Sequence, residues 1–269
     1  MGTISEITDT EFQQFQALIF KIAGIHIDSG KKALVVGRLG RRLAHFGLGT
    51  FAQYYQLLKK GEPPEEHQVM VDLLTTNETS FFRESKHFEF LQKEVLPRRS
   101  RASTFRIWSA ACSSGEEPYT LAMVLAESMG TTPWEIQASD ISLTVLEKAQ
   151  RAQYHLDRAT GIPLDLLRKY CLKGVRDQDG TFIISNRLRE HIGFRQINLN
   201  LPLPEIGQFH VIFLRNILIY FDMETKRRIV ASLLTKLMPG GYFFIGHSES
   251  LNGICDTVTN IRPTVYQKP

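Results

Sequence analysis

Residues 106–125 read RIWSAACSSGEEPYTLAMVL, and this stretch decides the fold. Its apolar start predicts a buried strand, the small residues around Gly115 predict a turn, and the apolar pattern after Pro118 predicts a helix. A loop that binds phosphate in such a unit carries several glycines, because backbone amides must approach the anion. Here Gly115 stands alone before Glu116 and Glu117, which would repel a phosphate. The sequence therefore disfavours a nucleotide-dependent dehydrogenase.

The same alternation of strands and helices continues from residue 104 to the end of the chain. Strands are predicted in TFRIWSAA, WEIQASD, FHVIFLR and GYFFIGH, with helices between them. This rhythm predicts an α/β fold with a parallel sheet, and a ligand beyond the carboxyl ends of its strands. Residues 154–193 break the rhythm with a short helix and a hairpin at Asp179-Gly180, which indicates a small inserted β-subdomain. The final TVYQKP is a candidate edge strand.

A separate all-α domain is predicted for residues 1–84, and the α/β domain for residues 85–269. Helical patterns occupy DTEFQQFQALIFKIAGI, KKALVVGRLGRRLAHFGL, TFAQYYQLLKKG and EHQVMVDLLTTNETSFFRESKHFEFLQKEVL, the last as two helices separated by the polar residues Thr75 to Thr79. Thr8 or Asp9 is the candidate cap of the first helix, and Gly24 is its stop.

The second of these helices has a basic face. Four cationic side chains recur at three- and four-residue spacing: Arg38, Arg41, Arg42 and His45. Such a stripe can dock an acidic partner, and the alternative is that it is only a solvated surface.

Polar side chains at the predicted strand ends indicate the ligand. Asp140 ends the second strand, where a carboxylate can accept hydrogen bonds from both hydroxyls of a ribose. Glu116 and Glu117 in the first turn would attract a cation. S-adenosylmethionine has a ribose, a sulfonium and an ammonium but no phosphate, so it fits this acidic loop. The alternative is that the two glutamates only interact with the dipole of the following helix.

The composition is that of a globular protein without disulfides or membrane spans. The 269 residues are 43% hydrophobic and carry a net charge of +4, which suits an acidic partner but is too weak to indicate nucleic acid. Three widely separated cysteines, Cys112, Cys171 and Cys255, indicate neither a disulfide framework nor a zinc site. We find no secretory signal and no apolar run of roughly 18 residues, so the sequence predicts a cytoplasmic protein. Nothing in it requires more than a monomer.

Six segments, in this order, resemble the signatures of the CheR family, the chemotaxis receptor glutamate methyltransferases. They are TTNETSFFRE, WSAACSSGEEPYTLAM, ASDIS, INLN, FHVIFLRNILIYF and LMPGGYFFIGHSESL. The resemblance implies a Rossmann-like class I S-adenosylmethionine-dependent methyltransferase domain. It implies methyl ester formation on glutamate side chains of chemoreceptor cytoplasmic helices, with S-adenosylhomocysteine as the second product. The partner would then be a chemoreceptor, with recruitment to membrane-bound receptor arrays and no insertion into the membrane.

The resemblance also implies a set of cofactor-binding residues and no metal. The set is Asn77, Thr79, Arg83, Glu117, Asp140, Asn198, Leu199, Arg215 and Asn216. Asn77, Thr79 and Arg83 would close over the cofactor from the helical region. An alternative is that Asn77 and Thr79 cap helices.

The remaining members of that set follow later strands. Asn198 and Leu199 would flank the adenine, and the alternative for Asn198 is an ordinary turn residue. Arg215 and Asn216 would lie under the methionine portion. Arg215 ends an apolar strand, and a buried guanidinium needs ionic partners.

Methyl transfer to a carboxylate demands positioning more than acid–base chemistry. A glutamate with a pKa of about 4.3 is ionised at neutral pH, so it needs no general base. Arg83 is the candidate cation for the incoming carboxylate, and Tyr220 is the candidate hydrogen-bond donor beside it. The alternatives are that Arg83 binds the cofactor carboxylate and that Tyr220 belongs to the core.

Two further expectations concern partners and competing functions. The basic helix would dock on acidic receptor helices, and in some relatives the β-subdomain captures a receptor C-terminal peptide by strand addition.

A nucleic-acid methyltransferase would suit the basic charge, but an evident target-base motif is missing. A non-catalytic adaptor on the same fold is the other alternative.

Overall fold

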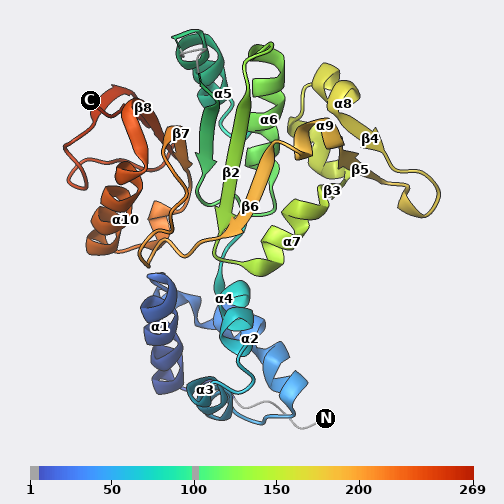
Figure 1. Ribbon diagram of the computed structural model, residues 1–269. Coiled ribbons are helices and arrows are strands. Elements are labelled where there is room, and N and C mark those ends of the chain that lie inside the picture. Colours follow the sequence, from blue (N-terminus) through green and yellow to red (C-terminus); the bar gives the residue numbers. More distant parts are fainter. Residues whose placement is uncertain (1–5, 99–102) are drawn as a thin grey trace.

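The computed structural model describes residues 6–98 and 103–269, which form a helical domain at one end of an α/β domain (Figure 1). The helical domain contains α1 Asp9–Ala23, α2 Lys32–Phe46, α3 Phe51–Lys60 and α4 Glu66–Leu74. The predicted division at residue 84 falls just before the next helix, α5 Lys86–Phe90. No helix within the described ranges is long and apolar enough to cross a membrane.

Threonine side chains cap the start of α1 and α3, and glycines end α1, α2 and α3. The Thr8 hydroxyl accepts from the Glu11 amide at 3.2 Å, and the Glu11 carboxylate accepts from the Thr8 amide at 2.7 Å. This reciprocal capping box makes Thr8, rather than Asp9, the cap of α1. Gly24 ends α1 in the left-handed conformation with a φ of 72°, as its position in the sequence predicts.

A buried carboxylate joins three helices of this domain. Glu66 of α4 is 1% exposed and accepts from Arg42 of α2 at 2.7 and 2.6 Å. It also accepts from the Tyr54 hydroxyl of α3 at 2.7 Å. Burial raises the pKa of Tyr54, so this hydroxyl remains a donor. The network fixes the relative positions of α2, α3 and α4 beside their apolar core.

The α/β domain is built on a seven-stranded sheet in the order β6-β2-β1-β7-β8-β10-β9. The strands are β1 Phe105–Ser109, β2 Trp134–Asp140, β6 Ile192–Gln196, β7 Phe209–Leu214, β8 Leu237–Ile245, β9 Thr259–Arg262 and β10 Val265–Gln267. The first five strands in this order run parallel, and β10 runs antiparallel to both of its neighbours. The predicted parallel sheet is confirmed, and its strand order reverses between β1 and β7, where α/β folds bind ligands.

Helices cover both faces of this sheet (Figure 1). They are α5, which continues as a π-helical turn at Leu91–Val95 and a 3-10 turn at Leu96–Arg98, α6 Glu116–Ser128, α7 Leu143–Arg151 and α10 Met223–Thr235. Successive residues of β1 enter different cores: Ile107 packs in one apolar cluster and Trp108 in another. Burial on both faces explains why the central strands read as continuous apolar runs.

The last strands differ from the prediction. The C-terminal segment forms β10, but β10 lies inside the sheet between β8 and β9, so the predicted edge position is wrong. The edge is β9, and all four of its residues are exposed. Because β9 has no apolar face, its sequence lacks the alternation that marks a strand.

The inserted β-subdomain has its own three-stranded sheet in the order β3-β5-β4. Its elements are β3 Gln153–His155, a 3-10 turn at Leu156–Gly161, α8 Leu164–Tyr170, β4 Cys171–Lys173, a 3-10 turn at Arg176–Gln178, β5 Thr181–Ile184 and α9 Asn186–Arg189. The hairpin predicted at Asp179-Gly180 is confirmed, because β4 and β5 pair antiparallel around it. β4 is the outer strand of this small sheet on the side away from β3.

The Glu66 network leads to a prediction about stability. We expect Glu66→Gln to lower the free energy of unfolding by about 3 kcal/mol, because it leaves the Arg42 guanidinium without its counter-ion. Urea unfolding followed by circular dichroism measures the change. Glu65→Gln is the matched control, since Glu65 is exposed, and it should stay within about 0.5 kcal/mol of the unmodified protein. Equal effects of both substitutions would contradict a structural role for the network.

Candidate active site

A cleft of about 1190 Å³, counting its open mouth, lies between the two domains. Its walls come from the C-terminal end of α1 and the following loop, the segment between α4 and α5, and the loops after β1, β2, β6 and β7. The cleft therefore lies at the carboxyl ends of the parallel strands, where the alternation of strands and helices predicts a ligand. All nine predicted cofactor residues line it: Asn77, Thr79, Arg83, Glu117, Asp140, Asn198, Leu199, Arg215 and Asn216.

The two adjacent glutamates at the start of α6 have different partners. Glu117 lines the cleft and accepts from the Ser109 hydroxyl at 2.7 Å and from Arg215 Nη1 at 2.9 Å. Glu116 is 1% exposed and pairs with Arg158 of the inserted subdomain. Only Glu117 is therefore available to a ligand, and Glu116 joins the subdomain to the sheet domain.

The turn before these glutamates requires its glycine. Gly115 has a φ of 98°, and a Cβ there would lie 2.9 Å from both the Ala149 Cβ and the Tyr154 hydroxyl. No bulkier residue fits without moving α7 or the subdomain. Gly115 is therefore needed for the close packing of this turn against α7 and the inserted subdomain.

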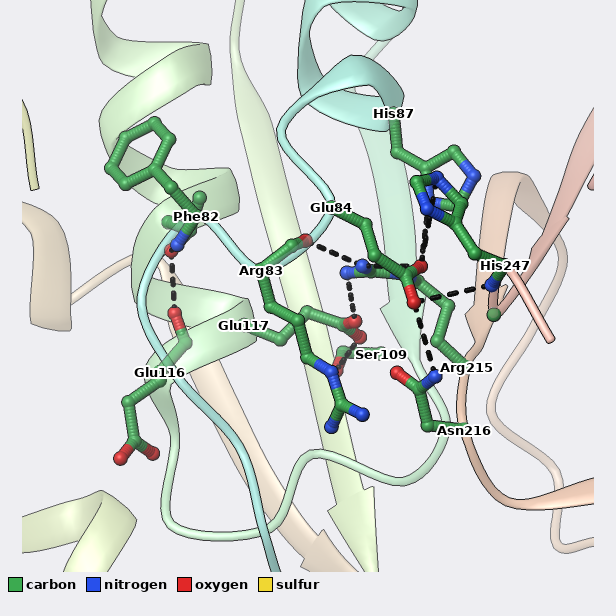
Figure 2. A network of polar contacts seen from close by, with 12 residues as sticks. Phe82, Arg83, Glu84, His87, Ser109, Glu116, Glu117, Arg215, Asn216 and His247 are labelled. Carbon is green, nitrogen blue, oxygen red and sulfur yellow. Dashed lines mark hydrogen bonds and ion pairs between the residues drawn. The ribbon is translucent and has the colours of Figure 1, made fainter. Parts of the chain in front are cut away.

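Arg215 is the centre of a buried charge cluster (Figure 2). Its side chain is 2% exposed and lies 2.9 Å from Glu117 and 2.9 Å from Glu84. Arg215 Nη2 also donates to the Arg83 carbonyl. The expectation that this guanidinium has ionic partners is confirmed. Burial by itself would raise the pKa of Glu84, but the hydrogen bond and charge of Arg215 outweigh it and lower the pKa to about 2.

Asp140 ends β2 on the cleft wall and is anchored by backbone amides. Its two carboxylate oxygens accept from the amides of Ser113 at 2.9 Å and Ser142 at 3.0 Å. Burial raises its pKa despite these hydrogen bonds. Each oxygen keeps a further lone pair for a ligand donor such as a ribose hydroxyl.

The segment between α4 and α5 crosses one side of the cleft and carries Asn77, Thr79 and Arg83. Asn77 and Thr79 are cap residues of neither flanking helix, because Thr75 ends α4 and Ser85 precedes α5. The structure therefore does not support the helix-cap alternative. Arg83 Nη1 donates to the Glu78 carbonyl at 2.9 Å, and its side chain diverges from that of Glu84 (Figure 2).

Asn198 already has protein partners. Its amide nitrogen donates to the Ile22 carbonyl at the end of α1, at 2.8 Å, and its oxygen accepts from the Asn200 amide at 2.9 Å. The second bond closes a local turn, so the turn-residue interpretation is correct for this side chain. One amide hydrogen and one lone pair remain for an adenine edge, and its role toward the cofactor stays a prediction.

Tyr220 is half-buried and lines the cleft, so it is not a core residue. The Nζ of Lys31 lies 5.9 Å from the centre of its ring, and the Tyr220 carbonyl accepts from the His26 amide at 2.8 Å. The lining of the same cleft also includes Lys31, His26 and Arg83. These basic side chains share the cleft with the carboxylates of Glu117 and Asp140.

The basic face predicted on α2 is only half exposed. Arg42 is held by Glu66, and Arg38 Nη1 donates to the carbonyls of Leu74 at 3.1 Å and Thr75 at 2.9 Å. Arg41 and His45 remain exposed. A fully solvated face, the alternative to docking, is therefore wrong for Arg38 and Arg42, because Leu74, Thr75 and Glu66 supply acceptors for them. The docking role of the four residues stays a prediction.

Sequence reasoning did not single out three titratable groups behind the cleft. Glu249 is 8% exposed and accepts from the amides of Asn216 at 3.0 Å and Leu218 at 2.7 Å, which fixes the loop after β7. Burial raises its pKa. His87 of α5 is 3% exposed, and burial lowers its pKa to about 3. Glu249 lies in the quoted GHSES segment and Glu84 in FFRE, but only the tertiary structure identifies their partners.

Known protein families and relatives match nearly the whole chain. A family model described as "CheR methyltransferase, SAM binding domain" matches residues 77–267, and "CheR methyltransferase, all-alpha domain" matches residues 10–75. Chemotaxis protein methyltransferase 2 of Pseudomonas aeruginosa is 39% identical over 96% of this chain and 93% of its own. The chemotaxis protein methyltransferase of Escherichia coli K12 is 37% identical over 97% of this chain and 91% of its own. A solved glycopeptide N-methyltransferase MtfA bound to S-adenosylmethionine covers 72% of this chain and 61% of its own, with a TM-score of 0.39 and 15% identity.

The position of Asp140 leads to a prediction about cofactor affinity. We expect Asp140→Asn to weaken S-adenosylhomocysteine binding about 10- to 100-fold, because a charged acceptor is worth about 1.5–3 kcal/mol. Isothermal titration calorimetry measures the change, and Asp165→Asn, at an exposed position in the subdomain, is the control. Because the pKa of Asp140 is raised, affinity should be full above that pKa and fall as the pH drops through it. Unchanged affinity of Asp140→Asn in a folded protein would contradict the assignment.

Proposed function

Because the chain belongs to the CheR methyltransferase family, we propose that it methylates glutamate side chains on the cytoplasmic helices of a chemoreceptor. It is a methyltransferase of the chemotaxis type, since both family models and the named relatives agree along nearly its whole length. The observation that carries the proposal is that the cleft lining contains both carboxylates and cations. Acidic Glu117 and Asp140 lie at the strand ends, and basic Arg83 lies on the segment that crosses them.

The acidic part of the cleft suits S-adenosylmethionine. This cosubstrate supplies an electrophilic methyl group on a sulfonium. Glu117 has lone pairs for its ammonium, and Asp140 has lone pairs for its ribose hydroxyls. Arg215 holds the Glu117 carboxylate by an ion pair of 2.9 Å, so this acceptor is oriented before a ligand arrives. A phosphate-bearing dinucleotide would meet carboxylates instead of a glycine-rich cradle.

The basic part suits the methyl acceptor. A glutamate carboxylate is already ionised, so Arg83 would orient it and the Tyr220 hydroxyl would donate a hydrogen bond to its second oxygen. One carboxylate oxygen attacks the methyl carbon with a lone pair that accepts no hydrogen bond, an oxygen–carbon bond forms as the sulfur–carbon bond breaks, and the electron pair remains on sulfur. The products are the glutamate methyl ester and S-adenosylhomocysteine. Positioning in a site that excludes water supplies most of the rate, up to roughly 7–11 kcal/mol in favourable cases.

Two surfaces outside the cleft suit a receptor. Arg41 and His45 on the exposed face of α2 would contact acidic receptor helices. β4 is the outer strand of the subdomain sheet, and its backbone could add a receptor C-terminal peptide as a further strand. In this proposal the protein acts as a monomer in the cytoplasm, recruited to receptor arrays.

The direct test is methyl transfer from tritiated S-adenosylmethionine to a receptor cytoplasmic fragment. We expect label that alkali releases as methanol, as an ester requires, and no label when the acceptor glutamates are replaced by alanine. Labelling of RNA instead would support a nucleic-acid methyltransferase. Binding of the cosubstrate without transfer to either would support a non-catalytic adaptor.

Arg83 gives a sharper prediction. We expect Arg83→Ala to lower kcat about 100-fold, since a charge-assisted hydrogen bond to the acceptor contributes on the order of 3 kcal/mol. Calorimetry should show S-adenosylhomocysteine affinity within about threefold of the unmodified protein, and Arg83→Lys should restore part of the rate. Lys86→Ala, at an exposed neighbouring position, is the control. A loss confined to cofactor affinity would instead assign Arg83 to the cofactor carboxylate.

The docking surface can be tested by charge reversal. The double substitution Arg41→Glu and His45→Glu should raise the KM for the receptor fragment about tenfold or more and leave cofactor affinity unchanged. Lys59→Glu with Lys60→Glu is the matched control, because these exposed cations lie on α3 of the same domain. If both double substitutions raised the KM equally, the effect would come from the overall charge of the domain and not from a docking face on α2.

A further inference from the structure

Three potential metal ligands meet beside Arg215 (Figure 2). Glu84 precedes α5, His87 lies in its first turn, and His247 follows β8. Glu84 Oε2 lies 3.5 Å from His87 Nδ1 and 4.0 Å from His247 Nε2, and the three ligand atoms all lie within 4.8 Å of one another. None of the three residues lines the cleft.

The hydrogen bonds of His87 bear on which ring nitrogen is free. The Thr264 hydroxyl contacts the Pro263 carbonyl at 2.6 Å and His87 Nε2 at 2.7 Å. When this hydroxyl donates to the carbonyl, it accepts from His87 Nε2, the ring hydrogen lies on Nε2, and Nδ1 presents a lone pair. This arrangement is typical of metal-binding histidines, in which the second nitrogen donates to a fixed acceptor.

The free lone pair of His87 needs a positive partner. Within the described part of the chain, Nδ1 is buried and has no hydrogen-bond partner. The Glu84 carboxylate, which is itself an acceptor, lies 3.5 Å from it. Two acceptors facing each other in a buried site are unfavourable unless a cation or a donor lies between them.

The charge around the site is mixed. Glu84 pairs with Arg215, which also contacts Glu117, and the charges of Arg215 and Arg262 both act on His87. Arg215 does not block the site, because a carboxylate oxygen has two lone pairs and Glu84 Oε2 can serve both Arg215 and a metal ion. Its positive charge would, however, weaken metal binding compared with a site lacking it.

We propose that Glu84, His87 and His247 bind a divalent transition-metal ion, with Zn²⁺ the best match. Two imidazole nitrogens and one carboxylate suit zinc, and a water would take the fourth position. Tetrahedral ligands at about 2.0–2.1 Å from zinc lie roughly 3.4 Å apart. The Glu84–His87 separation is close to this value, and the half-exposed His247 side chain can close the remaining gap by rotation. The ion would join α5 to the loop after β8 and would not touch the reacting groups.

This proposal differs from the expectation, based on the sequence, that the protein binds no metal. Residues 84 and 87 are too few to form a recognisable ligand motif, and residue 247 is far away along the chain. The three cysteines, which zinc sites often use, are not involved.

The test titrates the metal-free full-length protein with Zn²⁺ by calorimetry, and with Co²⁺ by its visible absorption. We expect one equivalent to bind with a tetrahedral cobalt spectrum, and zinc to raise the melting temperature. His247→Ala should weaken binding about tenfold or more and abolish the thermal shift. His155→Ala, an exposed histidine in the subdomain, is the matched control and should bind like the unmodified protein.

Two outcomes would overturn the proposal. One is the absence of saturable binding by the unmodified protein, and the other is equal binding by His247→Ala, which would place the metal elsewhere. His247 is 48% exposed at the side chain, so its replacement should leave the fold intact, which circular dichroism checks. S-adenosylhomocysteine affinity, measured in parallel, reports on the cleft separately.

Discussion

The buried ion pairs of Arg215 are the constraint on which the active site depends. A guanidinium that is 2% exposed is stable only if carboxylates compensate its charge, and Glu117 and Glu84 do so from opposite sides. Glu117 is thereby oriented toward the cleft, and Glu84 toward His87 and His247. The end of β7, the start of α6 and the turn before α5 are consequently held in one arrangement. The cofactor cleft and the candidate metal site share this single cation.

The cleft exists because the helical domain is bonded to the loops at the carboxyl ends of the strands. Asp72 of α4 accepts from the Thr144 amide of α7 at 3.0 Å, and Asn198 donates to the end of α1 at 2.8 Å. These bonds hold the segment between α4 and α5 across the sheet edge, with Arg83 on the cleft wall. In the proposed function, a methyl acceptor would approach the sheet edge beside this segment.

The sequence predictions were accurate where the deciding interactions join residues close together along the chain. They failed where those interactions join distant segments. Helices with caps and strands buried on both faces were predictable, because their patterns lie within a few residues. β9 was not, because all of its residues are exposed and no apolar period marks it. Arg38 and Arg42 looked solvated because spacing on one helix does not reveal the acceptors on α4. Glu84 and Glu249 were missed for the same reason, since their partners lie in other loops.

By itself, the sequence determined the α/β class, the polar residues at the strand ends and an acidic first loop that excludes phosphate. These properties depend on local periodicity and on the identity of neighbouring side chains. Only the tertiary structure decided that Glu117 faces the cleft while Glu116 faces Arg158, and that Glu84 meets two histidines. The physical reason is that burial and partner choice depend on chain segments far apart in sequence, whose approach no local pattern records.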